Sequence, residues 1–402
     1  MTQANPQALN DRTVRRNALV LSCAQALGGA SPAIVISLGG LVGQTLASDK
    51  ALATLPVSLY NLGLALGTIP AAMLMRRLGR RAAYMLGAAL GAGAGLLGAY
   101  SITASWFALF CLATAIAGMY GACVQSYRFG ATDGADAAFR ARAISWVMVG
   151  GLAGAVIGPQ TVIWTRDAIG AIPFAGSFLG QAGLALAAIP VLMLLRGSAR
   201  PAAEQSGGRP LKEIVASSRF VVAVIAGIVS FGMMSFVMTA APIAMVACGH
   251  TVGEAALGIQ WHVLAMFAPS FFTGRLISRF GKERITMAGL ILMAVSGTVA
   301  LAGLSVAHFW LSLVFLGVGW NLGFIGATAL VTDCYRPEER TKVQALNDFL
   351  VFGSVALASF SSGKLLNAAG WETINWLLYP AVAIVLVPLL WQSGRVARAP
   401  AA

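Results

Sequence analysis

Long apolar runs follow one another along almost the whole chain, and each is long enough to cross a lipid bilayer as a helix, which takes about 20 apolar residues. Only 10% of the 402 residues are charged and 58% are hydrophobic, whereas about 25% charged is typical of soluble domains. We therefore expect an all-α membrane protein of twelve transmembrane helices, which excludes a soluble enzyme, a disordered chain and a collagen-like fibre. The expected helices lie at residues 17–45, 51–75, 82–103, 105–131, 143–165, 172–195, 219–247, 254–277, 284–304, 307–331, 342–367 and 372–392.

Basic residues sort to one side of these helices. With the N-terminus inside, 24 of the 27 lysines and arginines fall on the inner side, and only Lys50, Arg166 and Lys364 fall outside. Positive charge gathers in cytoplasmic loops, so this asymmetry predicts an even number of spans with both termini cytoplasmic. The net charge of +13 therefore reports sidedness, and we expect no nucleic-acid partner.

The chain repeats itself at a fixed offset. Thr132-Asp133 recurs as Thr332-Asp333, 200 residues on, and the loop at 72–81 resembles the loop at 274–283, at an offset of 202 with Gly79 matched to Gly281. The longest hydrophilic stretch lies between the two copies. We therefore expect an N-terminal six-helix bundle at 1–196, a cytoplasmic linker at 197–218 and a C-terminal six-helix bundle at 219–402.

The two repeated loops resemble the G-x-L-x-D-R-x-G-R-R signature of the major facilitator superfamily, and the resemblance extends to the whole chain. It implies two pseudo-symmetric bundles that rock about a shared cavity and give alternating access. The signature positions held by Arg77, Gly79, Arg279 and Gly281 would then serve coupling and gating. The signature aspartate is replaced by Arg76 in the first loop and by Ser278 in the second.

Asp348 is the one acid that lies clearly inside an expected span. A buried lone carboxylate needs a partner, and we hypothesise that Arg76 pairs with it and latches the two halves. Alternatively, Asp348 is a solvated acid near a helix start, or a proton site. Arg128 is a candidate anion contact on the cavity floor, or else a snorkelling arginine or a partner of Asp133.

Polar and aromatic groups near the middle of the spans are the candidate substrate contacts, since each is costly against lipid. In the superfamily the first, second, fourth, eighth and tenth spans border the cavity. Such groups would stack a planar ring and read its edge, or else make helix–helix hydrogen bonds. His262 is either a carrier of a coupling proton or a structural histidine. The candidates are Gln25, Asn61, Tyr120, Gln260, Trp261, His262, Trp320 and Asn321.

Two further stretches, at 234–242 and 259–274, and the residues at 127–133 and 143–146 resemble a bacterial subgroup of the superfamily that includes riboflavin importers. We expect a monomeric secondary transporter in a bacterial inner membrane, moving a planar neutral or weakly polar solute, with membrane lipid as a partner and a proton as a candidate coupling ion. No acid lies at the middle of a span, which disfavours the first alternative, a proton-coupled exporter of drugs or metabolites. The second alternative is a non-transporting sensor or lipid-handling scaffold. No nucleophile–base pair, metal cluster, phosphate loop or dinucleotide motif is evident, so we expect no enzyme activity, metal or cofactor.

Overall fold

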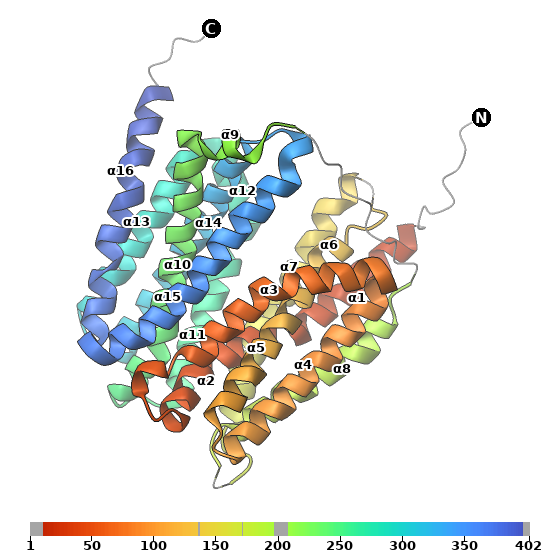
Figure 1. Ribbon diagram of the computed structural model, residues 1–402, viewed down its shortest axis with the longest axis vertical. Helices are drawn as coiled ribbons and strands as arrows, with labels where there is room; N and C mark the ends of the chain where they lie inside the picture. The colour runs from red at the N-terminus through yellow and green to blue at the C-terminus, as the bar shows by residue number, and fades with distance from the viewer. Residues whose placement is uncertain (1–10, 136, 171, 197–207, 397–402) are drawn as a thin grey trace. The chain divides into compact units, whose positions relative to one another are not determined.

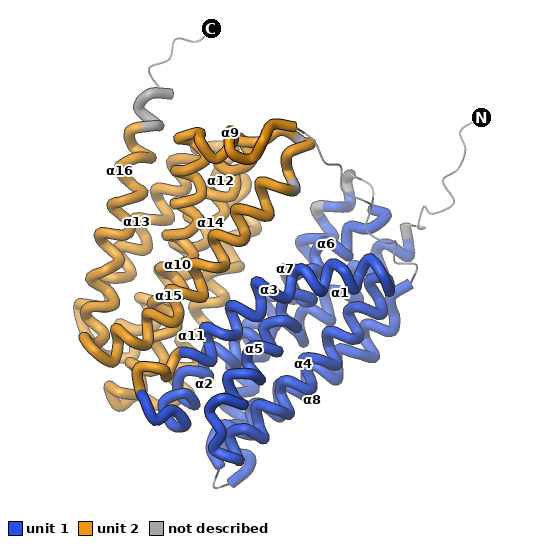
Figure 2. Tube along the Cα trace, in the orientation of Figure 1, with its two compact units in different colours: residues 1–49, 55–202 blue, residues 50–54, 203–402 orange. Residues whose placement is uncertain are grey.

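All regular structure in the described part of the chain is helical (Figure 1). The computed structural model describes residues 11–135, 137–170, 172–196 and 208–396. The chain divides into two compact units (Figure 2). Unit 1 holds residues 1–49 and 55–202, and unit 2 holds residues 50–54 and 203–402.

Unit 1 consists of helices packed lengthwise against one another. Its closest pairs are α3 with α5 and α4 with α8. The helices are α1 (Asp11–Gly28), α2 (Ala30–Leu46), α3 (Leu55–Leu78), α4 (Arg80–Thr103), α5 (Phe107–Gln125), α6 (Tyr127–Gly130), α7 (Ala137–Thr165) and α8 (Ala175–Met193).

In unit 2 the most extensive helix packing is that of α13 against α14 and of α10 against α15. Its elements are η1 (Lys50–Leu52), α9 (Leu211–Val215), α10 (Ser218–Ala247), α11 (Val252–Phe267), α12 (Ser270–Phe280), α13 (Lys282–Leu301), α14 (Val306–Thr332), η2 (Pro337–Glu339), α15 (Arg340–Trp376) and α16 (Leu378–Val396).

The helices confirm a membrane protein with many spans. In the described residues, ten helical stretches are long and apolar enough to cross a membrane, and an eleventh results if the bent pair α11–α12 is one span. The last stretch, Lys342–Trp391, has 50 residues, about 75 Å of helix, whereas the bilayer core is about 30 Å thick. Gly370 has φ 77° and ψ 179°, and the chain turns back between α15 and α16 (Figure 1). This stretch is therefore two crossings, which gives the twelve expected from the sequence.

Several of the expected spans are interrupted rather than continuous, among them the first and the eighth, which carry candidate site residues. The first is interrupted at Gly29, between α1 and α2. The eighth bends by 43° between α11 and α12, where Pro269 has no backbone N–H and cannot continue the helical hydrogen bonds. Hydropathy does not distinguish a broken apolar helix from a straight one, so neither break was expected from the apolar runs.

Small residues allow the helices to approach closely. A methyl group added at Gly118 of α5 would lie 2.0 Å from the Tyr60 carbonyl oxygen of α3. In α7, Gly150 faces Ser22 of α1, and Gly154 and Gly158 face Gly29 and Ala30 at the α1–α2 break. Small residues at helix contacts are the usual way for membrane helices to gain packing energy.

Candidate functional site

Five aromatic rings from four helices of unit 2 contact one another and form what we call the five-ring cluster. Trp320 lies at its centre, 5.2 Å from Phe231 and 5.3 Å from Phe324 between ring centroids, with the Phe324 ring inclined by only 16°. Phe267 lies 6.0 Å from Trp320, and Phe352 lies 5.7 Å from Phe231. The rings come from α10, α11, α14 and α15. The four phenylalanines are half-buried.

Trp320 has an unsatisfied hydrogen-bond donor. Its side chain is 7% exposed, and its Nε1–H has no hydrogen-bond partner among the described residues. A buried donor without an acceptor costs about 1–3 kcal/mol, whereas a buried indole N–H usually finds a partner. A planar ligand that presents an acceptor at its edge would satisfy this donor.

The other sequence candidates in unit 2 lie along α11 and α14, and they differ in how open they are. Trp261 is 44% exposed, whereas Gln260 is 8% exposed and His262 is fully buried. His262 donates from Nδ1 to the Leu313 carbonyl at 2.7 Å, and its enclosed Nε2 has no hydrogen-bond partner within the described ranges. The bond to α14 favours the structural alternative for His262.

Asn321 directly follows Trp320 on α14, but its side chain bonds to residues at the α11–α12 break. Its Nδ2 donates to the Met266 carbonyl at 2.6 Å and to the Ser270 hydroxyl at 2.7 Å, and its Oδ1 accepts from Thr273 at 2.6 Å. These three residues flank the α11–α12 break. Both donor hydrogens of the Asn321 amide and one lone pair of its oxygen are thus engaged by the protein.

The three candidates in unit 1 lie on three different helices. Tyr120 is 1% exposed and belongs to the main hydrophobic core of the unit, where its ring lies 2.3 Å from the position of a methyl added at Gly91. Asn61 of α3 is 9% exposed. Gln25 is half-buried beside the α1–α2 break, with its Nε2 3.2 Å from the position of a methyl added at Gly29.

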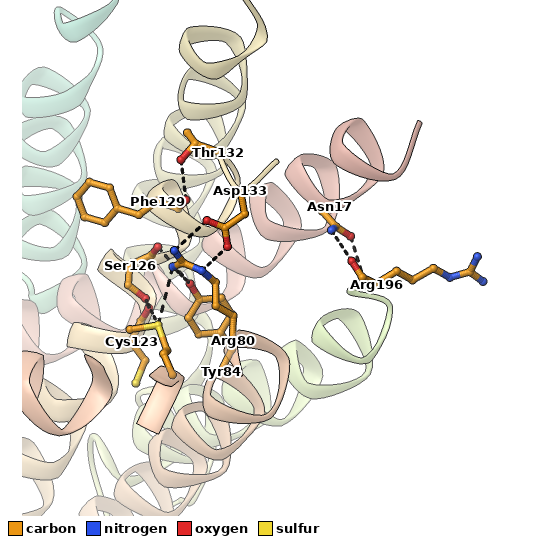
Figure 3. A network of polar contacts seen from close by, with 10 residues as sticks. Asn17, Arg80, Tyr84, Cys123, Ser126, Phe129, Thr132, Asp133 and Arg196 are labelled. Carbon is orange, nitrogen blue, oxygen red and sulfur yellow. Dashed lines mark hydrogen bonds and ion pairs between the residues drawn. The ribbon is translucent and has the colours of Figure 1, made fainter. Parts of the chain in front are cut away.

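Arg80 and Asp133 form the centre of a polar network at one end of unit 1 (Figure 3). Arg80 Nε lies 2.5 Å from Asp133 Oδ2, and Arg80 Nη2 donates to Oδ1 at 3.0 Å. Arg80 also donates to the Tyr84 hydroxyl, which in turn donates to the Ser126 carbonyl. Burial raises the pKa of the Asp133 carboxyl, and the neighbouring guanidinium opposes this shift.

Unit 2 repeats this ion pair at the equivalent position. Lys282 Nζ lies 2.5 Å from Asp333 Oδ1, and Arg219 donates to Oδ2 at 3.0 Å. In both units the base directly follows the signature glycine, which has a positive φ of 81° at Gly79 and 90° at Gly281. The sequence contained a signal for these pairs, because both partners recur at offsets of 200–202 residues.

The remaining gating candidates lie at helix ends. Arg76 and Arg77 are exposed in the last turn of α3, and Arg279 is exposed in the last turn of α12. The Arg128 guanidinium lies 4.9 Å from the centre of the Phe129 ring. Asp348 is exposed within unit 2, in the third turn of α15, and accepts from Asn347 Nδ2 at 3.2 Å.

Comparisons with known proteins identify related sequences over nearly the whole chain. The model of the Major Facilitator Superfamily matches residues 17–268 and 223–402. The riboflavin transporter RfnT of Brucella anthropi is 64% identical over 379 residues, covering 94% of this chain and 95% of that protein. The uncharacterized MFS-type transporter YdeG of Bacillus subtilis is 30% identical over 401 residues, covering 95% and 93%.

Solved structures share the fold at much lower identity. A mutant of the nucleoside transporter NupG superposes with a TM-score of 0.73 at 14% identity, covering 94% of this chain and 99% of that one. A D-xylose–proton symporter gives a TM-score of 0.71 at 15% identity, covering 94% and 97%. These two matches show the helical architecture alone.

Proposed function

Since this chain belongs to the major facilitator superfamily, we propose that it is an importer of riboflavin or of a closely similar planar solute, which it moves by alternating access. The chain is a secondary transporter of a small solute and not an enzyme. The 64% identity to a riboflavin transporter over 94% of the chain supports the choice of substrate.

The geometric observation that carries this proposal is the unpaired Nε1–H of Trp320 inside the five-ring cluster. Riboflavin has a flat tricyclic ring whose edge bears carbonyl oxygens and ring nitrogens. The ring would stack on the half-buried phenylalanines, and an edge acceptor would receive the Trp320 hydrogen bond. The unpaired donor of Trp320 suits a ring edge that bears hydrogen-bond acceptors, which supports a planar solute of this kind.

Uptake and binding measurements test this assignment. Cells that cannot synthesise riboflavin should grow on low external riboflavin when they express the chain, and the purified protein should quench riboflavin fluorescence. Trp320→Phe keeps a stacking ring but removes the donor. A net hydrogen bond contributes about 1 kcal/mol, so this variant should bind about fivefold more weakly.

Trp164→Phe is the matched control, because Trp164 lies in unit 1, is no candidate contact and is 77% exposed, and its riboflavin binding should be unchanged. Absence of riboflavin uptake and binding in the unmodified protein would contradict the proposed substrate. Equal weakening by both tryptophan variants would contradict the role given to the five-ring cluster.

We propose further that Arg76 and Asp348 pair in one state of the transport cycle and that both termini are cytoplasmic. The charge reversal relative to the superfamily signature supports the pairing, since Arg76 stands where an aspartate is usual. The 24-to-3 distribution of basic residues supports the orientation. We also propose that the protein lies in a bacterial inner membrane, that it is a monomer and that its transport is coupled to a proton.

A further inference from the structure

The bend between α11 and α12 is held by one side chain from a different helix. Pro269 has no backbone N–H, so the helical hydrogen bonds stop there. Asn321 of α14 bonds to Met266 on the α11 side of the break, and to Ser270 and Thr273 on the α12 side. The Thr273 hydroxyl also lies 2.8 Å from the Pro269 carbonyl. Asn321 therefore joins the two half-helices across the 43° bend.

The Asn321 amide is enclosed by the protein, and its donor hydrogens are not available to a ligand. The side chain is 0% exposed, both of its donor hydrogens are used, and its oxygen accepts one bond at 2.6 Å. A satisfied buried amide network fixes one geometry, because breaking any bond leaves a polar group unpaired. Direct contact with a solute, which the sequence suggested for Asn321, would require this network to open.

Asn321 is linked through the backbone to two members of the five-ring cluster, Trp320 and Phe267. Trp320 precedes Asn321 on α14, and Phe267 follows Met266 as the last residue of α11. The bond from Asn321 to the Met266 carbonyl therefore connects the backbone next to Phe267 with the backbone next to Trp320. These two rings lie 6.0 Å apart at an angle of 74°.

We infer that Asn321 is a positioning residue for substrate binding: it sets the α11–α12 bend and thereby the spacing of Phe267 and Trp320, without touching the solute. This inference rests on the proposed function for its binding part, whereas the bend itself is a property of the protein alone. Two readouts are therefore needed, one with riboflavin and one without any ligand.

The ligand-free readout is a distance across the bend. Spin labels at Gly253→Cys in α11 and Ser278→Cys in α12, in a background whose five native cysteines are replaced by alanine, report its angle by pulsed electron spin resonance. Gly253 has room for a side chain and Ser278 is exposed. At 1.5 Å per residue, straightening the 43° bend would lengthen the distance by about 2–3 Å.

The two test variants differ in severity. Asn321→Leu has nearly the same shape and removes all three Asn321 bonds. Thr273→Val is isosteric and removes one of these three, together with the contact between the Thr273 hydroxyl and the Pro269 carbonyl, so that it serves if the first variant fails to fold. Both should broaden or shift the distance distribution. Riboflavin should bind at least tenfold more weakly to Asn321→Leu and about threefold more weakly to Thr273→Val.

Thr286→Val is the matched control, because Thr286 is equally buried but bonds only within α13. Neither readout should change in it.

Each result decides between roles. Weaker binding with an unchanged distance would mean that Asn321 contacts the solute directly, and this would overturn the inference. A changed distance with unchanged binding would overturn the link between the bend and the site. An unchanged distance in both variants would overturn the inference whatever the binding. If the unmodified protein binds no riboflavin, the proposed function fails, and the distance measurement still decides whether Asn321 holds the bend.

Discussion

The Arg209 guanidinium donates to both carboxylate oxygens of Glu339, with Nε 2.9 Å from Oε1 and Nη2 2.9 Å from Oε2. The backbone N–H groups of Arg209 and Arg336 donate to the same carboxylate at 2.7 and 2.9 Å. Glu339 is fully buried directly before α15, although glutamate is rarely so. The segment that leads into α10 is thus fixed to the start of α15. A methyl added at Gly208 would lie 2.3 Å from Glu339 Cγ, so the fit requires glycine there.

This ion pair predicts an acid-dependent loss of stability. The four donors hold the pKa of the Glu339 carboxyl far below the usual glutamate value of about 4.3. A carboxyl whose pKa is lowered by folding stabilises the protein above its unfolded pKa, and the stabilisation is lost as the pH falls towards the folded pKa. Below about pH 5 the midpoint of thermal unfolding should therefore fall more steeply in the unmodified protein than in Glu339→Gln.

Glu338→Gln supplies the control for this measurement, since Glu338 is the exposed neighbour. It should leave the pH profile unchanged, whereas Glu339→Gln should also make the segment before α10 more sensitive to protease at neutral pH. A pH profile that is identical in all three proteins would refute the anchoring role of the pair.

The Arg80–Asp133 pair predicts a loss of stability when one partner is removed. Arg80 and Asp133 side chains are only 11% and 20% exposed, so Asp133→Ala leaves a largely buried guanidinium without its carboxylate. Hydrogen bonds to charged groups contribute about 1.5–3 kcal/mol, and we expect a loss of about 2 kcal/mol in detergent unfolding titrations. Arg81→Ala changes an exposed arginine one residue away and should change stability by less than about 0.5 kcal/mol. Equal losses in both variants would argue against a specific pair.

Helix packing in unit 1 predicts a strong asymmetry between two glycines. In Gly118→Ala the new methyl would meet the Tyr60 carbonyl 2.0 Å away, which forces α3 and α5 apart and should cost about 3 kcal/mol. Gly93 of α4 is exposed, with no atom within 4 Å of such a methyl, so Gly93→Ala should be neutral or stabilise the helix by up to about 1 kcal/mol. Unfolding titrations of the two variants compare them directly, and a Gly118→Ala protein as stable as the original would show that α3 and α5 can separate freely.

The sequence predicted the features of the fold that depend on local pattern. Apolar runs indicated the spans, and the offset of 200–202 residues indicated that Gly79 and Gly281 are equivalent, as their shared positive φ confirms. Gly370, which divides the last helical stretch, has the same kind of conformation. These features follow from hydropathy and from the steric freedom of glycine, which both act over a few residues.

The five-ring cluster was beyond sequence reasoning for a physical reason. Phe231, Phe267, Phe324 and Phe352 are apolar residues in apolar helices, and a phenylalanine that faces a site has the same pattern as one that faces lipid. Only Trp320 stood out, because its N–H is polar. Asn321 stood out for the same reason, yet its amide serves the α11–α12 bend. Polarity thus marks a residue that needs a partner without saying whether that partner is a solute or the backbone.

The proposed pairing of Arg76 with Asp348 predicts non-additive transport defects. If the two charges stabilise one state of the cycle together, Arg76→Ala and Asp348→Ala should each slow riboflavin uptake, and the double variant should be no slower than the worse single one. The coupling between residues in one ion pair is typically about 0.5–3 kcal/mol, which is measurable in initial rates. Arg77 lies in the same last turn of α3 and is also exposed, so Arg77→Ala combined with Asp348→Ala should give simple additivity. The exchanged pair, Arg76→Asp with Asp348→Arg, should regain much of the rate. Additive effects of Arg76→Ala and Asp348→Ala, with no recovery in the exchanged pair, would leave Asp348 as a solvated acid or a proton site.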